Sequence, residues 1–117
     1  MFSADEEFSK EPERLLKEML DQPSVLFNSH RLAIMLELSH AGAVDFIQLR
    51  HDLELTDGAL ATHMKALTKG RFVESKKEQV ETRERTVFIL TRDGMDALDR
   101  FLNVISEIRG EIKSVTG

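Results

Sequence analysis

The sequence predicts a mostly α-helical domain with one two-stranded β-hairpin placed before its last helix. Apolar residues recur every three or four positions over most of the chain, which is the period of an amphipathic helix. The period becomes strand-like only between residues 71 and 91, where β-branched and aromatic residues gather. The chain has 117 residues, about the length of one compact core, so we expect a single domain over residues 1–117.

The first part of the chain is predicted to hold two helices after a flexible start at residues 1–11. Pro12 fits the first turn of a short helix over residues 12–20, which Pro23 and its neighbours end. Asn28 or Ser29 can cap a second helix that runs to residue 40, with Gly42 marking its end. We expect this second helix to be buried, because apolar residues surround its axis: Leu32, Ala33, Ile34, Met35, Leu36 and Leu38.

Residues 45–70 are predicted to form two short helices separated by a tight break. Thr56 is a good N-cap for the second of them, and the charge of Asp57 suits the positive end of its dipole. The two apolar stripes are Phe46, Leu49 and Leu53, then Leu60, Met64 and Leu67. Helices this short can bury such stripes only if they cross each other and pack against the helix before them.

Two β-prone runs, 71–75 and 86–91, are joined by the charged stretch KKEQVETRER, which predicts an antiparallel hairpin with a long mobile tip. Thr91 then caps a last helix over residues 92–113. That helix would be roughly 33 Å long, whereas a compact chain of this size has a radius of gyration of only about 13 Å. The end of the helix would therefore extend beyond the domain, and its apolar residues need a partner. We expect a homodimer through both terminal helices: Leu15, Leu16, Met19, Leu98, Phe101, Leu102, Ile105 and Ile108.

The order helix, helix, helix-turn-helix, hairpin, helix is that of a winged helix. Residues 27–102 resemble small single-domain winged-helix transcription regulators of the MarR and ArsR type. HRLAIMLEL is similar to their scaffold helix, LTDGALATHMKAL to their recognition helix, RFVESKK and RTVFILT to their wing strands, and LTRDGMDAL to the start of their last helix. The resemblance implies a winged helix-turn-helix with additional N- and C-terminal helices. It also implies a homodimeric repressor or activator that binds double-stranded DNA, with the recognition helix 57–69 in the major groove and the wing 76–85 on the backbone or minor groove.

The charge distribution agrees with a local DNA-binding surface. The formal net charge of −5 argues against nonspecific coating of nucleic acid, but residues 56–92 carry eight Lys and Arg against five Asp and Glu. With Leu60 on the buried side of a helix, the opposite face is small and basic, which suits a groove about 12 Å wide. The candidate DNA-binding residues are Thr56, Gly58, Thr62, His63, Lys65, Lys69, Lys76, Lys77, Arg83 and Arg85.

Several alternatives stay open at this point. The basic face could be an ordinary solvated surface, and His63 on the helix flank fits a local hydrogen bond as well as a phosphate contact. The wing departs from the MarR pattern of an acid followed by two arginines, so either Arg83 or Arg85 could reach DNA. Arg71 stands where these proteins usually have glycine, so it either faces a phosphate or bears a small strain at positive φ. A winged helix can also be a protein interaction module without DNA binding, which the overall acidity favours.

Other classes of protein fit poorly. The chain has no Cys, which excludes disulfides, thiolate zinc sites and Cys nucleophiles. Its four His are scattered, and we find no phosphate loop or nucleophile motif, so we expect no metal, no cofactor and no enzymatic activity. No apolar run approaches the ~20 residues that cross a bilayer, and the start of the chain is acidic, so we expect a soluble cytoplasmic protein. A small-molecule effector stays open.

Overall fold

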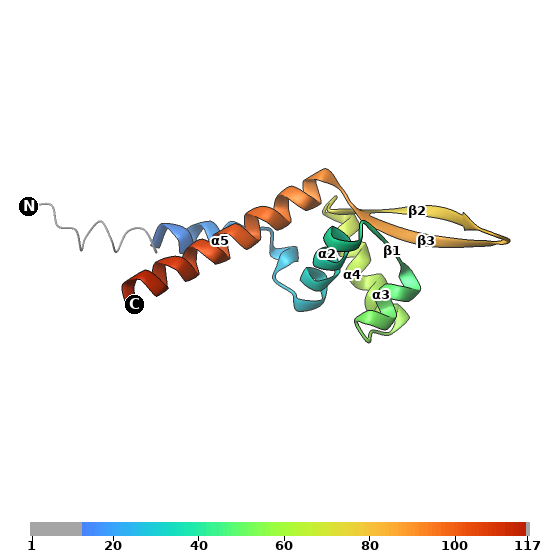
Figure 1. Cartoon of the computed structure of the whole chain (residues 1–117), viewed down its shortest axis with the longest axis horizontal. Helices are drawn as coiled ribbons and strands as arrows, with labels where there is room; N and C mark the ends of the chain where they lie inside the picture. Colours follow the sequence, from blue (N-terminus) through green and yellow to red (C-terminus); the bar gives the residue numbers. More distant parts are fainter. Residues whose placement is uncertain (1–12, 117) are drawn as a thin grey trace, which may run out of the picture.

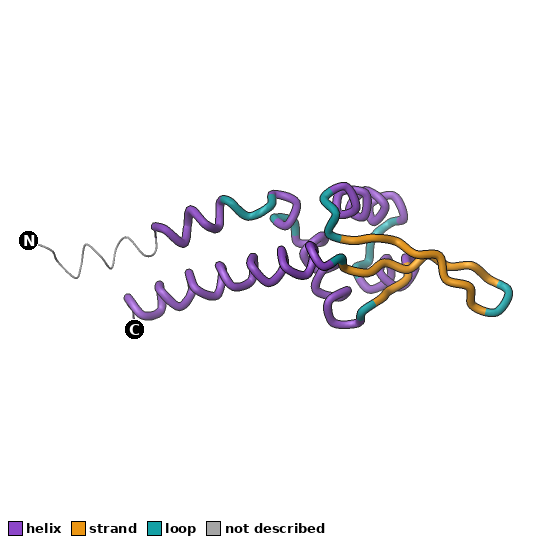
Figure 2. The backbone as a smooth tube through the Cα atoms, turned by 90° about the horizontal axis from the view of Figure 1, so that it is seen from above, coloured by secondary structure: helices purple, strands orange, loops and turns teal. Residues whose placement is uncertain are grey.

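The structure is a computed structural model that describes the backbone of residues 13–116 and the side chains of residues 13–110. The flexible start predicted for residues 1–11 lies outside this range. Figure 1 shows an elongated arrangement, in which a hairpin projects at one end and the first and last helices run side by side at the other, as Figure 2 also shows. The radius of gyration is 18.5 Å, well above the value of about 13 Å for a compact chain of this length.

Helices make up the body of the molecule. A helical segment at residues 13–20 is followed by the 3₁₀ turn η1 (Ser24–Leu26). Next come α2 (Ser29–Ala41), α3 (Phe46–Asp52) and α4 (Asp57–Lys69), and α5 (Arg92–Thr116) ends the described chain. The predicted fold class, mostly helical with a β-hairpin, is confirmed.

Side-chain caps explain where these helices begin. The Oγ1 atoms of Thr56 and Thr91 accept hydrogen bonds from the backbone N–H groups of Ala59 and Gly94, at 3.1 and 2.9 Å, as their predicted cap roles require. Asn28, rather than Ser29, caps α2. Asp45 caps α3 by accepting from the Gln48 N–H at 2.7 Å, a cap that our sequence analysis missed.

The hairpin belongs to a three-stranded antiparallel sheet of order β1-β3-β2. Its strands are β1 (Ala43–Asp45), β2 (Val73–Val80) and β3 (Arg83–Leu90). The two-stranded hairpin is confirmed, but the expectation of a long tip between the strands is wrong. Pairing continues to Val80 opposite Arg83, and only Glu81 and Thr82 form the turn. Strand β1 escaped prediction because three residues are too short to show alternation.

The core forms where α2, α3 and α4 meet the sheet and the first half of α5. The predicted stripe of α4 is buried: Leu60, Met64 and Leu67. The expectation that α2 is buried all round is wrong, since Leu36 is 40% exposed while Ile34, Met35 and Leu38 are buried. Among the described elements, α4, α5, η1 and the sheet pack most closely on α2, and the side of the helix that carries Leu36 stays exposed.

Arg71 ends α4 in a left-handed conformation. Its φ is 63°, and the N–H groups of Arg71 and Phe72 donate to the carbonyls of Thr68 and Leu67, each at 3.0 Å. This is a Schellman motif with Arg at the position that favours glycine. The positive φ expected for Arg71 is therefore confirmed, and the Thr91 hydroxyl donates to the Arg71 carbonyl at 2.6 Å.

The terminal helices cover each other within one chain. Leu15, Leu98 and Phe101, which we predicted at a dimer interface, are buried in the single chain. Leu98 and Phe101 belong to the main core, where Phe101 packs on Phe27, and Leu15 lies on the segment 13–20, which runs alongside α5 (Figure 2). Leu16, Leu102 and Ile105 remain exposed, and Met19 and Ile108 are half-buried. In the part of the chain that the structure describes, no helix is long and apolar enough to span a membrane.

Candidate nucleic-acid interface

The exposed face of α4 is small and basic, as the helical pattern predicts. Gly58, Thr62, Lys65 and Lys69 all lie exposed on the side away from the core. The Thr62 hydroxyl donates to the Gly58 carbonyl at 2.9 Å, which leaves its oxygen free to accept from the amino group of a base. Among the described side chains neither Lys65 nor Lys69 has an acidic partner, so both ammonium groups are available to an anion.

A shallow groove separates this face of α4 from the sheet. It has a volume of about 530 Å³. Its walls are apolar apart from two lysines and a threonine: Phe46, Ala61, Met64, Lys65, Thr68, Lys69 and Phe88. The groove runs from the exposed face of α4 to Phe88 at the base of the hairpin.

The start of α4 is held by a charge pair. The Arg50 Nε lies 3.1 Å from a carboxylate oxygen of Asp57, and both side chains are largely exposed. The Thr56 hydroxyl accepts from the Ala59 N–H and retains its own proton for a second partner. Thr56 is thus placed at the helix N-terminus, where backbone N–H groups and the dipole favour an anion such as a phosphate.

His63 faces α2 rather than the exposed face of α4. Its Nδ1 lies 3.4 Å from an Nη1 of Arg31, and its ring stacks on that of His30 with centroids 5.4 Å apart. Burial, and then the charges of Arg31 and His30, lower the pKa of His63 below its ordinary value. Of the two roles left open by the sequence, this geometry fits a neutral local support.

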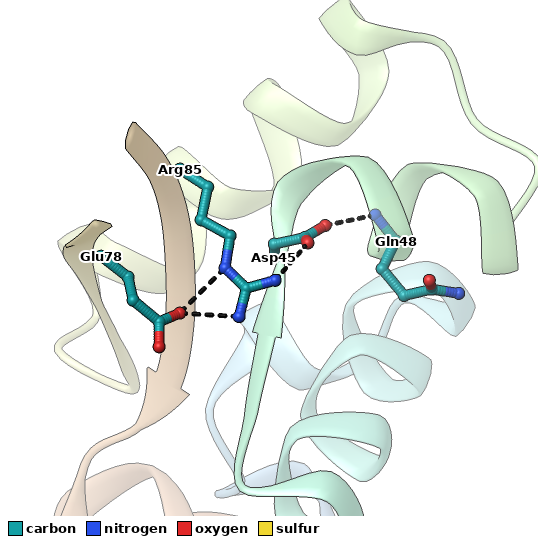
Figure 3. A network of polar contacts seen from close by, with 4 residues as sticks. All are labelled: Asp45, Gln48, Glu78 and Arg85. Carbon is teal, nitrogen blue, oxygen red and sulfur yellow. Dashed lines mark hydrogen bonds and ion pairs between the residues drawn. The ribbon is translucent and has the colours of Figure 1, made fainter. Parts of the chain in front are cut away.

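The wing arginines differ in what surrounds them. Figure 3 shows the Arg85 guanidinium between two carboxylates: its Nε and Nη2 lie 2.9 and 2.8 Å from Glu78, and its Nη1 lies 3.2 Å from Asp45. Arg83 is exposed and has no acidic partner among the described residues. The structure thus distinguishes two arginines that the sequence left equivalent.

The lysines of the wing differ in the same way. Lys77 donates to the Thr86 hydroxyl at 2.9 Å and lies 3.8 Å from a carboxylate oxygen of Glu84. Lys76 is exposed, and no acidic side chain in the described range pairs with it. Lys76 and Arg83 are therefore the more available cations of the hairpin.

Two acidic residues that are not candidate DNA-binding residues, Glu37 and Asp52, lie next to each other. Glu37 on α2 is hydrogen-bonded to Asp52 at the end of α3, and the Gln48 amide donates to Asp52 at 2.7 Å. Burial and the neighbouring carboxylate raise the pKa of Glu37 to about 7. This pair escaped prediction because Glu37 and Asp52 are distant in the chain and meet only in the folded protein.

A family model described as a winged helix DNA-binding domain matches residues 30–108. An uncharacterized protein of Methanocaldococcus jannaschii is 33% identical over 89 residues, which cover 75% of this chain and 97% of that protein.

Solved structures include two informative neighbours. A transcriptional regulator homologue from Pyrococcus horikoshii superposes with a TM-score of 0.76 at 31% identity, covering 85% of this chain and 97% of that one. A mutant of MarR from E. coli, solved in complex with operator DNA, superposes with a TM-score of 0.64 at 17% identity over 93% of this chain and 77% of that one. The second likeness is one of fold.

Proposed function

Because this chain belongs to the winged helix DNA-binding domain family, we propose that it is a homodimeric transcription regulator that binds a specific DNA sequence. Its structural neighbours are MarR-type transcription regulators, so family and fold point to a regulator and not to an enzyme. The observation that carries the proposal is the exposed, basic face of α4, which a groove links to the base of a projecting hairpin. In that hairpin Lys76 and Arg83 have no acidic partner among the described residues.

In the proposed complex α4 enters the major groove. Thr62 and Lys65 reach base edges, where a lysine can donate to O6 and N7 of guanine. Lys69 and the N-terminus of α4 at Thr56 and Gly58 contact phosphates. Lys76, Lys77 and Arg83 of the hairpin lie along the backbone, with Arg83 directed into the minor groove, where the negative potential is deepest.

The exposed apolar residues of the terminal helices support the homodimer. A depression of about 380 Å³ between the segment 13–20 and α5 has almost no polar lining: Leu16, Met19, Ile105, Ile108 and Arg109. Leaving such a surface in water would cost roughly 1.5–3 kcal/mol for each large apolar side chain that could be buried fully. A second copy covers it about a two-fold axis and places the two recognition helices roughly 34–36 Å apart, one DNA turn.

Selection from a random DNA pool with the purified protein tests this proposal. Enrichment of a two-fold symmetric site is the expected result. The affinity for that site should fall by orders of magnitude between about 50 and 200 mM salt, because each phosphate contact releases counterions. No enrichment, together with no salt-dependent binding, would instead support the alternative of a winged helix that serves as a protein interaction module.

A further inference from the structure

We infer that Arg85 positions the wing through Asp45 and Glu78 and does not contact DNA. The inference rests on the proposed function, because it concerns how the hairpin is presented to DNA. Asp45 and Glu78, which are not candidate DNA-binding residues, then have a structural role, and Arg85 is no longer a candidate contact of DNA.

Strand register brings the three side chains together. Glu78 lies directly opposite Arg85 in the β2–β3 pairing. Asp45 lies opposite Val87, two residues along β3 from Arg85, so all three side chains emerge on one face of the sheet. Arg83 is on that face too, but its cross-strand neighbour is Val80, which offers no charge.

Strand β1 ends at Asp45, so the part of the hairpin beyond it lacks a third strand and needs another contact to support it. Strand β1 pairs with β3 only from Ala43 to Asp45, so beyond Val87 the wing is a two-stranded ribbon. Such a ribbon is marginally stable by itself. Arg85 is the first side chain past the end of β1 that points back toward it, and its guanidinium bridges β2 and the last residue of β1 (Figure 3).

Asp45 connects this bridge to the helix-turn-helix. One carboxylate oxygen accepts from the Gln48 N–H at 2.7 Å and caps α3, while the other lies 3.2 Å from Arg85. The carboxylate therefore fixes the direction of the wing relative to α3. The guanidinium has its Nε, Nη1 and Nη2 engaged with carboxylates, so a phosphate would have to displace them.

Asp45→Asn separates the two roles that Arg85 could have. Asn caps a helix as well as Asp, so α3 should keep its start, but the ion pair with Arg85 is lost. If Arg85 positions the wing, both Asp45→Asn and Arg85→Gln should weaken DNA binding, each about three- to tenfold for a partly exposed pair. The double variant should be no weaker than Arg85→Gln, because both changes break one interaction.

Glu81→Gln is the matched control, since it also removes one negative charge from the DNA-facing end of the molecule and its side chain has no described ion pair. It should bind DNA as tightly as the unmodified protein or slightly more tightly. If Asp45→Asn binds as tightly as Glu81→Gln while Arg85→Gln is weaker, Arg85 contacts DNA directly and the inference is overturned. Unchanged binding of both variants would overturn it as well.

Hydrogen–deuterium exchange of the free protein tests, without DNA, whether the contacts of Arg85 with Asp45 and Glu78 hold the wing in place. Amides of β2 and β3 should exchange several-fold faster in Asp45→Asn and Arg85→Gln than in Glu81→Gln. Equal exchange in the three variants would refute this role of Arg85, even if the protein binds DNA. If the unmodified protein selects no DNA, the proposed function fails, and the exchange experiment still decides the role of Arg85.

Discussion

Gly94→Ala should destabilise the protein, although the substitution usually strengthens a helix. Gly94 lies in the first turn of α5, and its N–H donates to the capping Thr91. A Cβ at this position would lie 2.0 Å from the carbonyl oxygen of Phe72 and 2.9 Å from its carbonyl carbon. The start of α5 therefore packs directly on the backbone that leads into β2.

The size of the effect follows from these contacts. The helix and the Phe72 carbonyl must move apart by more than 1 Å to reach an ordinary contact. The same carbonyl accepts from the Thr91 N–H at 3.0 Å, so the movement also weakens that hydrogen bond. Overpacking costs about 1–3 kcal/mol, the hydrogen bond contributes about 0.5–1.5 kcal/mol, and the gain in helix propensity offsets about 0.5–1 kcal/mol. The net loss is therefore about 0.5–4 kcal/mol. At about 4 °C per kcal/mol for a domain of this size, the melting temperature should fall by about 2–16 °C.

Thermal unfolding followed by far-ultraviolet circular dichroism measures this change, at one protein concentration because a dimer melts at a concentration-dependent temperature. Gly110→Ala is the control in the same helix. A Cβ at Gly110 meets no atom within 4 Å, so this variant should be stabilised slightly by helix propensity. A Gly94→Ala protein that melts at or above the temperature of the unmodified protein would refute the reasoning.

Lys65→Ala should change the base preference at a cost of about 1–3 kcal/mol, whereas Arg83→Ala should weaken binding to all sequences and reduce the salt slope by about one; unchanged titrations of both variants would contradict the proposed contact surface. Ile105→Glu combined with Ile108→Glu should give a monomer in sedimentation velocity, because like charges would meet across the two-fold axis. If the unmodified chain is already monomeric at micromolar concentration, this surface is not a dimer interface. Glu37 has a pKa of about 7 in the folded protein against an ordinary 4.5, so the folded state binds more protons between these values. The stability from this group is present below its ordinary pKa and is lost as pH rises through about 7. The part of the fall in melting temperature with rising pH that Glu37 causes should therefore be absent in Glu37→Gln. If the melting temperatures of the two proteins depend on pH in the same way, this role of Glu37 is refuted.

The sequence predicted those features whose signal is local. Thr56 and Thr91 are recognisable as caps because a cap needs only the residue and the helix that follows it. The buried stripe at Leu60, Met64 and Leu67 follows from the helical period alone. The exposed face of α4 follows from the same period, since it is the side opposite that stripe.

The features that escaped prediction depend on contacts between distant segments. The charged residues from Lys76 to Arg85 have little strand propensity, so they were expected to form a mobile tip. They pair because the hairpin extends from a base fixed by Val73, Phe88 and the short strand β1. The difference between Arg83 and Arg85 has the same origin, because only the register decides which of them lies opposite an acid.

The position of β2 at the edge of the sheet has a consequence for aggregation. In the order β1-β3-β2 no strand of the described part of the chain pairs with the outer side of β2, and every residue of β2 after Val73 is exposed. An open edge of eight residues can pair with a strand of another molecule, and charged side chains oppose such pairing. The charges of Lys76, Lys77 and Glu78 along this edge therefore oppose pairing between the hairpins of two molecules. Apolar replacements of the two lysines would remove this protection together with their positive charge, so glutamine is the replacement that separates loss of nucleic-acid contact from self-association.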